Sequence, residues 1–136
     1  NPRHDSLSSL TSYFCLHADR FLSLAGITWR LEETKGAPDL ALDSRRRHQL
    51  FLAFKEALTN VVRHAQATAC HIVLALNARA MTVEITDDGV GLPDDVRSGV
   101  GLTSMRERAA ELGGECRIAT NGHGTRVYAR LPIAEE

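Results

Sequence analysis

The longest periodic segment of the chain is residues 44–65, which have the sequence SRRRHQLFLAFKEALTNVVRHA. Its apolar side chains recur at every third or fourth position, the spacing that places them on one face of an α-helix. These side chains are Leu50, Phe51, Phe54, Ala57, Leu58, Val61, Val62 and Ala65. Asp43 or Ser44 can cap the start of such a helix. The pattern therefore predicts a long amphipathic helix that packs on a sheet.

Shorter periodic segments lie on both sides of this helix. Helical spacing predicts one helix from Ser6 to about Ala25 and another from about Gly101 to Leu112, each followed by a glycine where helices commonly stop. Alternation of apolar and polar residues predicts five strands. Their apolar residues are Ile27, Trp29 and Leu31; Ile72, Leu74 and Leu76; Met81, Val83 and Ile85; Cys116 and Ile118; and Val127, Ala129 and Leu131. The order α-β-α-β-β-α-β-β predicts an α+β fold, a two-layer α/β sandwich with a mixed five-stranded sheet and three helices on one face.

The composition limits the classes of partner. A chain of 136 residues with 43% hydrophobic residues has the size of one domain with a real core. Sixteen basic and seventeen acidic residues give a formal net charge of -1, so no general electrostatic field attracts nucleic acid or an anionic membrane. We therefore expect no nucleic acid partner and no membrane contact from this segment, and any anion must bind at a local site.

The cysteines and the apolar runs indicate the compartment. Cys15, Cys70 and Cys116 form neither a CxxC pair nor a cluster with zinc spacing, so we expect free thiols in a reducing cytoplasm. The apolar runs are far shorter than the roughly 20 residues that span a bilayer. We expect a soluble, cytoplasmic segment. The first residue is Asn1 rather than methionine, which suggests a piece of a longer protein.

The long predicted helix also carries a polar stripe. Glu56, Asn60 and His64 are spaced four residues apart, so they lie on one side of the helix beside its apolar face. Such a stripe can line a cleft, although the solvent-facing side of an ordinary helix shows the same spacing.

Residues 87–91, Asp-Asp-Gly-Val-Gly, directly follow a predicted strand. Their two glycines allow the backbone to approach a flat ligand closely. A carboxylate beside such a turn can accept a hydrogen bond from an exocyclic amine of the ligand. The alternative is an ordinary Asp-Gly turn that closes a hairpin.

A second glycine pair, Gly99-Val100-Gly101-Leu102, opens the last predicted helix. Free backbone N–H groups at a helix N-terminus are suited to bind phosphate oxygens. Neither glycine pair matches the dinucleotide pattern GxGxxG, because Asp94 and Ser104 stand where the third glycine would be. The chain has no GxxxxGK[ST] segment, which excludes a P-loop enzyme, and residues 87–89 lack the ligand spacing of an EF-hand.

These segments, taken together and in this order, resemble the GHKL (Bergerat-fold) ATPase superfamily, and most closely the catalytic ATP-binding domain of sensor histidine kinases. The similar segments are residues 54–65 (the N box), 87–91 (the G1 box), 99–102 (the G2 box) and 124–127 (the closing GT motif). The phrase GLTSMRER at 101–108 resembles the subgroup that is paired with NarL-type response regulators. The resemblance covers residues 43–131, whereas residues 1–42 agree only in the order of their elements.

The resemblance implies roles for the residues of the N box. Asn60 would coordinate Mg²⁺, which bridges the ATP phosphates. Glu56 occupies the position of a general base or of a polariser of the attacking group. Arg63 would contact the terminal phosphates, although a surface arginine is an equal alternative, and His64 would line the nucleotide pocket.

The resemblance also implies how the glycine segments bind ATP. Asp87 would accept a hydrogen bond from the adenine amino group, with support from Thr125, and guanine would be disfavoured because it carries a carbonyl there. Gly89 and Gly91 would permit close approach of the ligand. The residues implied to meet the phosphates are Gly99, Gly101 and Leu102. Residues 92–98 would form a short ATP lid that lacks a phenylalanine-rich F box.

The implied function is that of a Mg-ATP-binding catalytic domain, residues 1–136, of a two-component sensor histidine kinase. It would donate the γ-phosphoryl group of ATP to a histidine on a separate dimerisation domain, for relay to a NarL-type response regulator. His4-Asp5 does not make a convincing acceptor, because no helix precedes it. Two alternatives remain: a serine kinase of the anti-sigma-factor type on the same fold, and a GHKL module kept as an interaction domain without catalysis.

Overall fold

The computed structural model describes residues 7–35, 43–64, 66–77, 79–90 and 100–133. Within these ranges the chain forms the helices and strands in the predicted order. The helices are α1 (Leu7–Leu24), α2 (Ser44–His64) and α4 (Val100–Glu111), and the strands are β1 (Thr28–Lys35), β2 (Ala69–Leu76), β3 (Ala80–Asp87), β4 (Glu115–Asn121) and β5 (Gly124–Pro132). None of these helices is long and apolar enough to cross a membrane.

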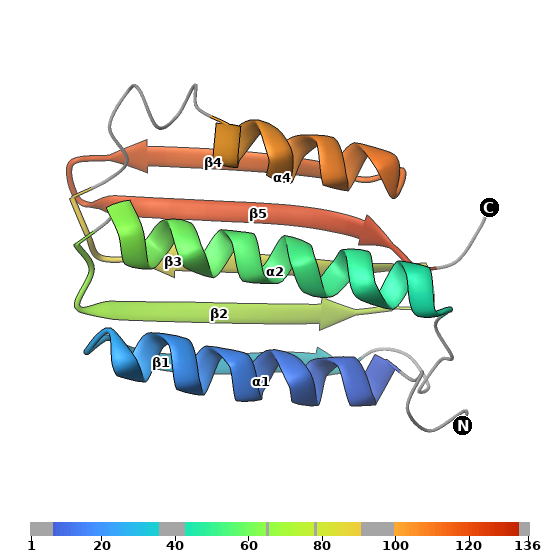
Figure 1. Ribbon diagram of the computed structural model, residues 1–136, viewed down its shortest axis with the longest axis horizontal. Helices are drawn as coiled ribbons and strands as arrows, with labels where there is room; N and C mark the ends of the chain where they lie inside the picture. Colours follow the sequence, from blue (N-terminus) through green and yellow to red (C-terminus); the bar gives the residue numbers. More distant parts are fainter. Residues whose placement is uncertain (1–6, 36–42, 65, 78, 91–99, 134–136) are drawn as a thin grey trace.

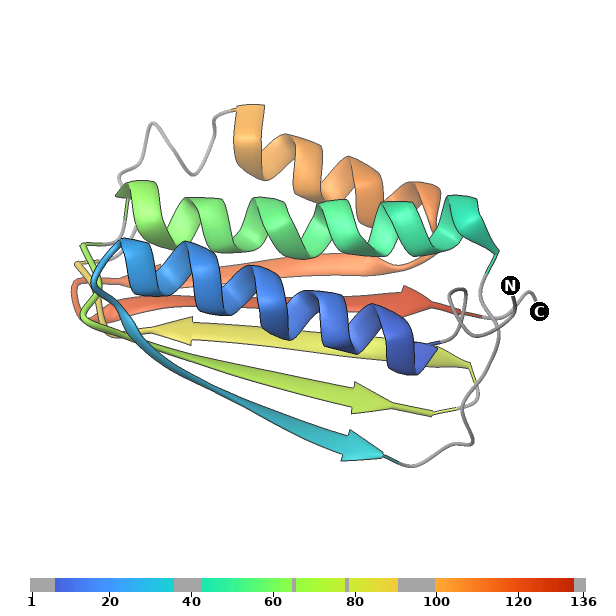
Figure 2. The same cartoon turned by 60° about the horizontal axis from the view of Figure 1, so that its bottom comes forward.

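The five described strands form one sheet in the order β1-β2-β3-β5-β4. Strands β1 and β2 are parallel, and the other neighbouring pairs are antiparallel, so the sheet is mixed. The three described helices lie on the same face of this sheet, with α1 over β1, α2 over β3 and β5, and α4 over β4 and β5 (Figures 1 and 2). The two-layer sandwich that the sequence predicts is confirmed.

The long helix α2 begins and packs as its sequence predicts. The backbone N–H of Arg46 donates to Asp43 Oδ1 at 2.7 Å, so Asp43 rather than Ser44 caps the helix. The apolar face of α2 is buried against the sheet and α1, and Phe54 stacks on Phe14 of α1 with ring centroids 4.2 Å apart. Burial of this face stabilises the two-layer packing.

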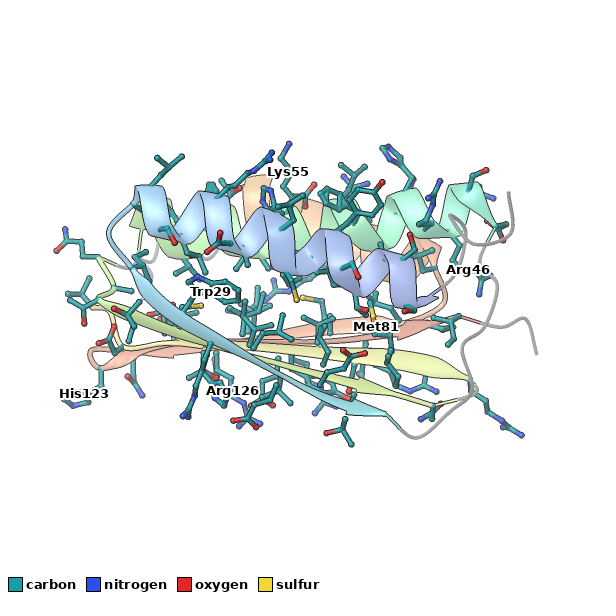
Figure 3. All side chains as sticks on the ribbon, turned by 90° about the horizontal axis from the view of Figure 1, so that it is seen from below. Trp29, Arg46, Lys55, Met81, His123 and Arg126 are labelled. Carbon is teal, nitrogen blue, oxygen red and sulfur yellow. The ribbon has the colours of Figure 1, made fainter. Side chains whose placement is uncertain are left out.

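The two faces of the sheet differ as the alternation predicts. Trp29 and Met81 point into the layer between the sheet and the helices, whereas Arg126 points away from the helices (Figure 3). The covered face contains fully buried side chains such as Leu74 and Ile85. The face away from the helices, which we call the open face, carries charged and polar side chains. Each strand therefore has one apolar and one solvated side.

Gly113 ends α4 with a φ of 80°, a left-handed conformation that suits glycine, and its N–H donates to Ala110 O at 2.9 Å. The end of α2, the end of β3 and the start of β5 lie at one edge of the molecule, on the left in Figure 1, and the start of α4 lies on the same side, further from that edge. The fold thereby brings segments from four elements to the same side of the molecule.

Candidate functional site

Asp87 is the last residue of β3, and its side chain lies on the covered face with 5% of its surface exposed. The N–H of Gly89 donates to Oδ1 at 2.8 Å, whereas Oδ2 is buried without a hydrogen-bond partner in the part of the chain that is described. Burial raises the pKa of this carboxyl, while the hydrogen bond from the N–H of Gly89 and the nearby backbone of Thr125 act in the opposite direction. A buried acceptor without a donor is rare in proteins, so this atom is suited to a ligand that donates a hydrogen bond.

The first residues of β5 complete the surroundings of Asp87. Thr125 is its direct partner across the β3–β5 pair and is 5% exposed, with its hydroxyl 3.1 Å from that of Thr120. Gly124 has a φ of 148°, and a Cβ there would lie 2.1 Å from the Asp87 carbonyl oxygen. Only glycine allows this approach. The sequence pattern placed Gly124 in a motif without assigning it to the site, so this packing role appears only in the structure.

Asp88 is the neighbour of Asp87 and has the opposite surroundings. Its Oδ1 accepts from the N–H groups of Thr68 and Ala69 at 2.8 and 2.9 Å, and its Oδ2 accepts from the Thr68 hydroxyl at 2.5 Å. These hydrogen bonds lower the pKa of Asp88 to about 2. Asp88 therefore anchors the loop that leaves β3 to the start of β2.

Asn60 lies on α2 with 8% of its surface exposed. Its amide Nδ2 donates to Met105 Sδ on α4 at 3.1 Å, which places the carbonyl oxygen on the opposite edge of the amide. An amide oxygen is a suitable ligand for a hard cation. Asn60 and Asp87 are thus both buried, and their roles remain predictions.

Glu56, one turn before Asn60, makes an ion pair with a residue of another helix. Arg108 Nη2 of α4 lies 2.7 Å from Glu56 Oε1, and Arg108 Nη1 donates to Gln49 Oε1 at 2.7 Å. Arg108 stands within the phrase at 101–108, but nothing in its spacing indicates a contact with a residue 52 positions earlier. Sequence reasoning missed this residue for that reason.

The other predicted site residues are only partly described. Gly89 is buried in the turn after β3, and Gly101 and Leu102 belong to the first turn of α4. Arg63 and His64 end α2, but their side chains lie outside the described part of the structure. Gly91 and Gly99 and the predicted lid at 92–98 also lie outside the described residues. Their predicted roles remain predictions.

An apolar cavity of about 20 Å³ lies between α2, α4 and the sheet. Met105 and Ala57 line it from the helices, and Ile85 and Val127 line it from β3 and β5. Ile85 precedes Asp87 by two residues and Val127 follows Thr125 by two, so each lies on the same side of its strand as that site residue. The volume suits about one water molecule, so this cavity is too small for a nucleotide base.

Comparison with known proteins identifies the kind of domain that contains this arrangement. Residues 46–135 match the family described as histidine kinase-, DNA gyrase B-, and HSP90-like ATPase. The chain is 40% identical over 107 residues to the signal transduction histidine-protein kinase/phosphatase UhpB of Salmonella typhimurium, covering 78% of this chain and 20% of UhpB. It is 34% identical over 116 residues to the sensor histidine kinase LiaS of Bacillus subtilis, covering 81% of this chain and 30% of LiaS. The chain therefore spans less than a third of each of these two relatives.

Solved structures have the same fold at lower identity. The catalytic domain of histidine kinase ThkA superposes with a TM-score of 0.74 at 15% identity, covering 96% of both chains. The histidine kinase AdeS of Acinetobacter baumannii superposes with a TM-score of 0.73 at 16% identity, covering 96% of this chain and 66% of that one. At such identities the likeness concerns the fold.

Proposed function

Because the chain belongs to the family of histidine kinase-, DNA gyrase B- and HSP90-like ATPases, we propose that it binds Mg-ATP and donates the γ-phosphoryl group to a histidine on a separate dimerisation domain. The resemblance to the catalytic ATPase domain of sensor histidine kinases, which the motifs indicate, is confirmed at the level of the family. The observation that carries the ligand proposal is the buried Oδ2 atom of Asp87, which has no donor in the described part of the chain.

Asp87 would recognise the adenine ring. Its Oδ2 atom can accept a hydrogen bond from the adenine amino group, and the absence of a side chain at Gly124 keeps β5 close to the end of β3. Guanine presents a carbonyl oxygen at that position, which would face the carboxylate without a proton between them. The site therefore favours adenine over guanine, with Thr125 supporting the same edge.

Asn60 fits the Mg²⁺ ion that accompanies ATP. The described residues contain no cluster of three or more His, Cys, Asp or Glu side chains that could hold a metal ion by themselves. Mg²⁺ usually keeps several waters and is bound by few protein ligands together with substrate phosphates, so a single amide oxygen from Asn60 is compatible with such a site. When bound, Mg²⁺ offsets the negative charge of the phosphates.

Glu56 would take the proton in the transfer step. A nitrogen of the acceptor imidazole attacks the γ-phosphorus, so that an N–P bond forms while the bond from this phosphorus to the bridging oxygen breaks and ADP leaves. The imidazole loses its N–H proton, and the Glu56 carboxylate is the group that we assign to accept it. Arg63 and the start of α4, with Gly99, Gly101 and Leu102, would bind the phosphates, and His64 would line the pocket.

The partners follow from this assignment. The chain would form one domain, residues 1–136, of a longer sensor kinase whose dimerisation domain carries the acceptor histidine. The phrase at 101–108 favours a NarL-type response regulator as the final acceptor. The three free cysteines fit a cytoplasmic location, because disulfides are rare in that compartment.

A binding experiment tests the adenine assignment. Titration of the chain with Mg-ATP and with Mg-GTP should show a preference for ATP, and ATP at about 100 times its Kd should stabilise the fold by about 2.7 kcal/mol. Asp87→Asn should abolish this stabilisation, because the amide would present a donor to the adenine amino group. Glu84→Gln, on the same strand but facing away from the helices, is the matched control and should bind ATP as the wild type does. Equal melting temperatures of the wild type with and without ATP would refute the proposal.

The metal assignment has its own test. Asn60→Ala should bind ATP with the same affinity in the presence and absence of Mg²⁺, whereas the wild type should bind more tightly with Mg²⁺. The measurement is a calorimetric titration of both proteins with and without a chelator. A variant that keeps the full Mg²⁺ dependence would show that Asn60 is not a ligand of the ion.

A further inference from the structure

Arg108 links the helix that carries Glu56 to the helix that begins with the predicted phosphate-binding turn. We propose that Arg108 is a positioning residue that holds the Glu56 carboxylate in its reactive orientation. This inference rests on the proposed function, because it concerns the group that accepts the proton in phosphoryl transfer.

The contact geometry suits a residue that fixes another side chain. Arg108 uses two different nitrogens, with Nη2 at 2.7 Å from Glu56 Oε1 and Nη1 at 2.7 Å from Gln49 Oε1. Gln49 and Glu56 are seven residues apart, which places them two turns apart on the same side of α2. A planar guanidinium held at both ends has little freedom to rotate, so it fixes the direction of the carboxylate that it contacts.

The surroundings distinguish this ion pair from an ordinary surface pair. The side chains of Arg108 and Glu56 are only 20% and 28% exposed. On the open face, Arg126 and Glu84 make an ion pair of the same length, 2.7 Å, but Arg126 is 60% exposed. Partial burial weakens the screening of the pair at Glu56, so this contact constrains its side chains more strongly.

A second hydrogen bond joins the same two helices, with its donor on α2. Met105, three residues before Arg108, accepts the hydrogen bond from Asn60, four residues after Glu56. One side of α4 therefore contacts Glu56 and Asn60, the residues of α2 to which we assign proton transfer and metal binding. Because α4 begins at Val100, any ligand bound at its first turn is connected through one rigid helix to the orientation of Glu56.

The rival explanation is that Arg108 merely joins two helices. In that case a substitution of Arg108 would lower the stability of the fold, and any loss of activity would be the same whether or not Glu56 is present. A positioning role predicts that the effect of changing Arg108 disappears when Glu56 is already neutral.

The experiment combines two measurements on the same set of variants, Arg108→Gln, Arg108→Lys, Glu56→Gln and the double variant. ATP affinity is measured on the 136-residue chain, and the rate of histidine phosphorylation from radiolabelled ATP is measured in the longer protein that contains it. We expect Arg108→Gln to slow phosphorylation about ten- to hundredfold while ATP affinity stays within about twofold, because only the orientation of the reacting group is lost. Arg108→Lys, which keeps the charge and one contact, should recover part of the rate.

The double variant decides between the two explanations. Arg108→Gln should cause no further loss of rate in the Glu56→Gln background, whereas Arg126→Gln on the open face should leave rate and affinity unchanged. A loss of rate from Arg108→Gln that is equal in both backgrounds, or a loss of affinity as large as the loss of rate, overturns the inference. A wild-type protein that neither binds ATP nor phosphorylates a histidine would instead overturn the proposed function, and the inference would fall with it.

Discussion

Asp87 and Asp88 are adjacent in the chain, but they belong to two different regions of the molecule. Asp87 faces the layer between sheet and helices, where burial raises its pKa and leaves one oxygen without a donor. Asp88 faces the exposed rim, where three hydrogen bonds from Thr68 and Ala69 lower its pKa to about 2. The carboxylate whose hydrogen bonds are satisfied stabilises the fold, whereas the one left unsatisfied on the covered side is available to a ligand.

The largest expected effect is a difference in the free energy of unfolding between substitutions on the two faces of the sheet. Leu74→Ala on the covered face should lower the free energy of unfolding by about 2–5 kcal/mol, because it leaves a cavity in a fully buried position. Val73→Ala, its neighbour on the open face of β2, should lower it by about 1 kcal/mol or less. Urea denaturation of both variants measures the difference. Equal losses would show that the open face is packed as tightly as the covered face.

The next effect concerns the stability of the ligand-free chain. Burial raises the folded-state pKa of Asp87 above its ordinary value of 3.8, so its contribution to stability is present below pH 3.8 and is lost as the pH rises through the folded pKa. Asp87→Asn removes this charge and should therefore be at least as stable as the wild type at pH 7. Its relative stability should increase between pH 3 and pH 7. Urea denaturation without nucleotide checks this, and a clearly less stable variant at pH 7 would contradict it.

The smallest expected effect lies at Asp88 and has the opposite dependence on pH. Its folded-state pKa is about 2, below the ordinary 3.8, so its contribution to stability is present above pH 3.8 and is lost as the pH falls toward 2. Asp88→Asn should be less stable than the wild type at pH 7, and the difference should shrink as the pH falls from 4 toward 2. Urea midpoints at several pH values provide the measurement. A difference that does not change with pH would exclude the carboxylate charge as its cause.

The sequence predicted the helices and strands well, for a physical reason that applies to each. The spacing of apolar residues reflects which side of a helix or strand is buried. It therefore revealed the buried side of α2, from Leu50 to Val61, and that of β2, at Ile72 and Leu74. The motifs around Asn60 and Asp87 carried the family resemblance through their residue types and spacings, and the family is confirmed. The sequence predicted either Asp43 or Ser44 as the cap of α2, and the hydrogen bond from Arg46 N–H shows that Asp43 is the cap.

Contacts between elements could not be predicted in the same way. The bond from Asn60 to Met105 and that from Glu56 to Arg108 join residues 45 and 52 positions apart, and no local pattern indicates such pairs. The close approach of Gly124 to Asp87 likewise depends on how β5 pairs with β3.

By itself the sequence determined the order of helices and strands, the side of each that is buried, and the motifs that carry the family resemblance, because these properties depend on neighbours a few residues away. Only the tertiary structure decided that Arg108 and Met105 contact the polar stripe of α2, and that Asp87 rather than Asp88 keeps a buried acceptor without a donor. Those outcomes depend on how distant elements pack, since hydrogen bonds and burial are set by contacts in space and not by position along the chain.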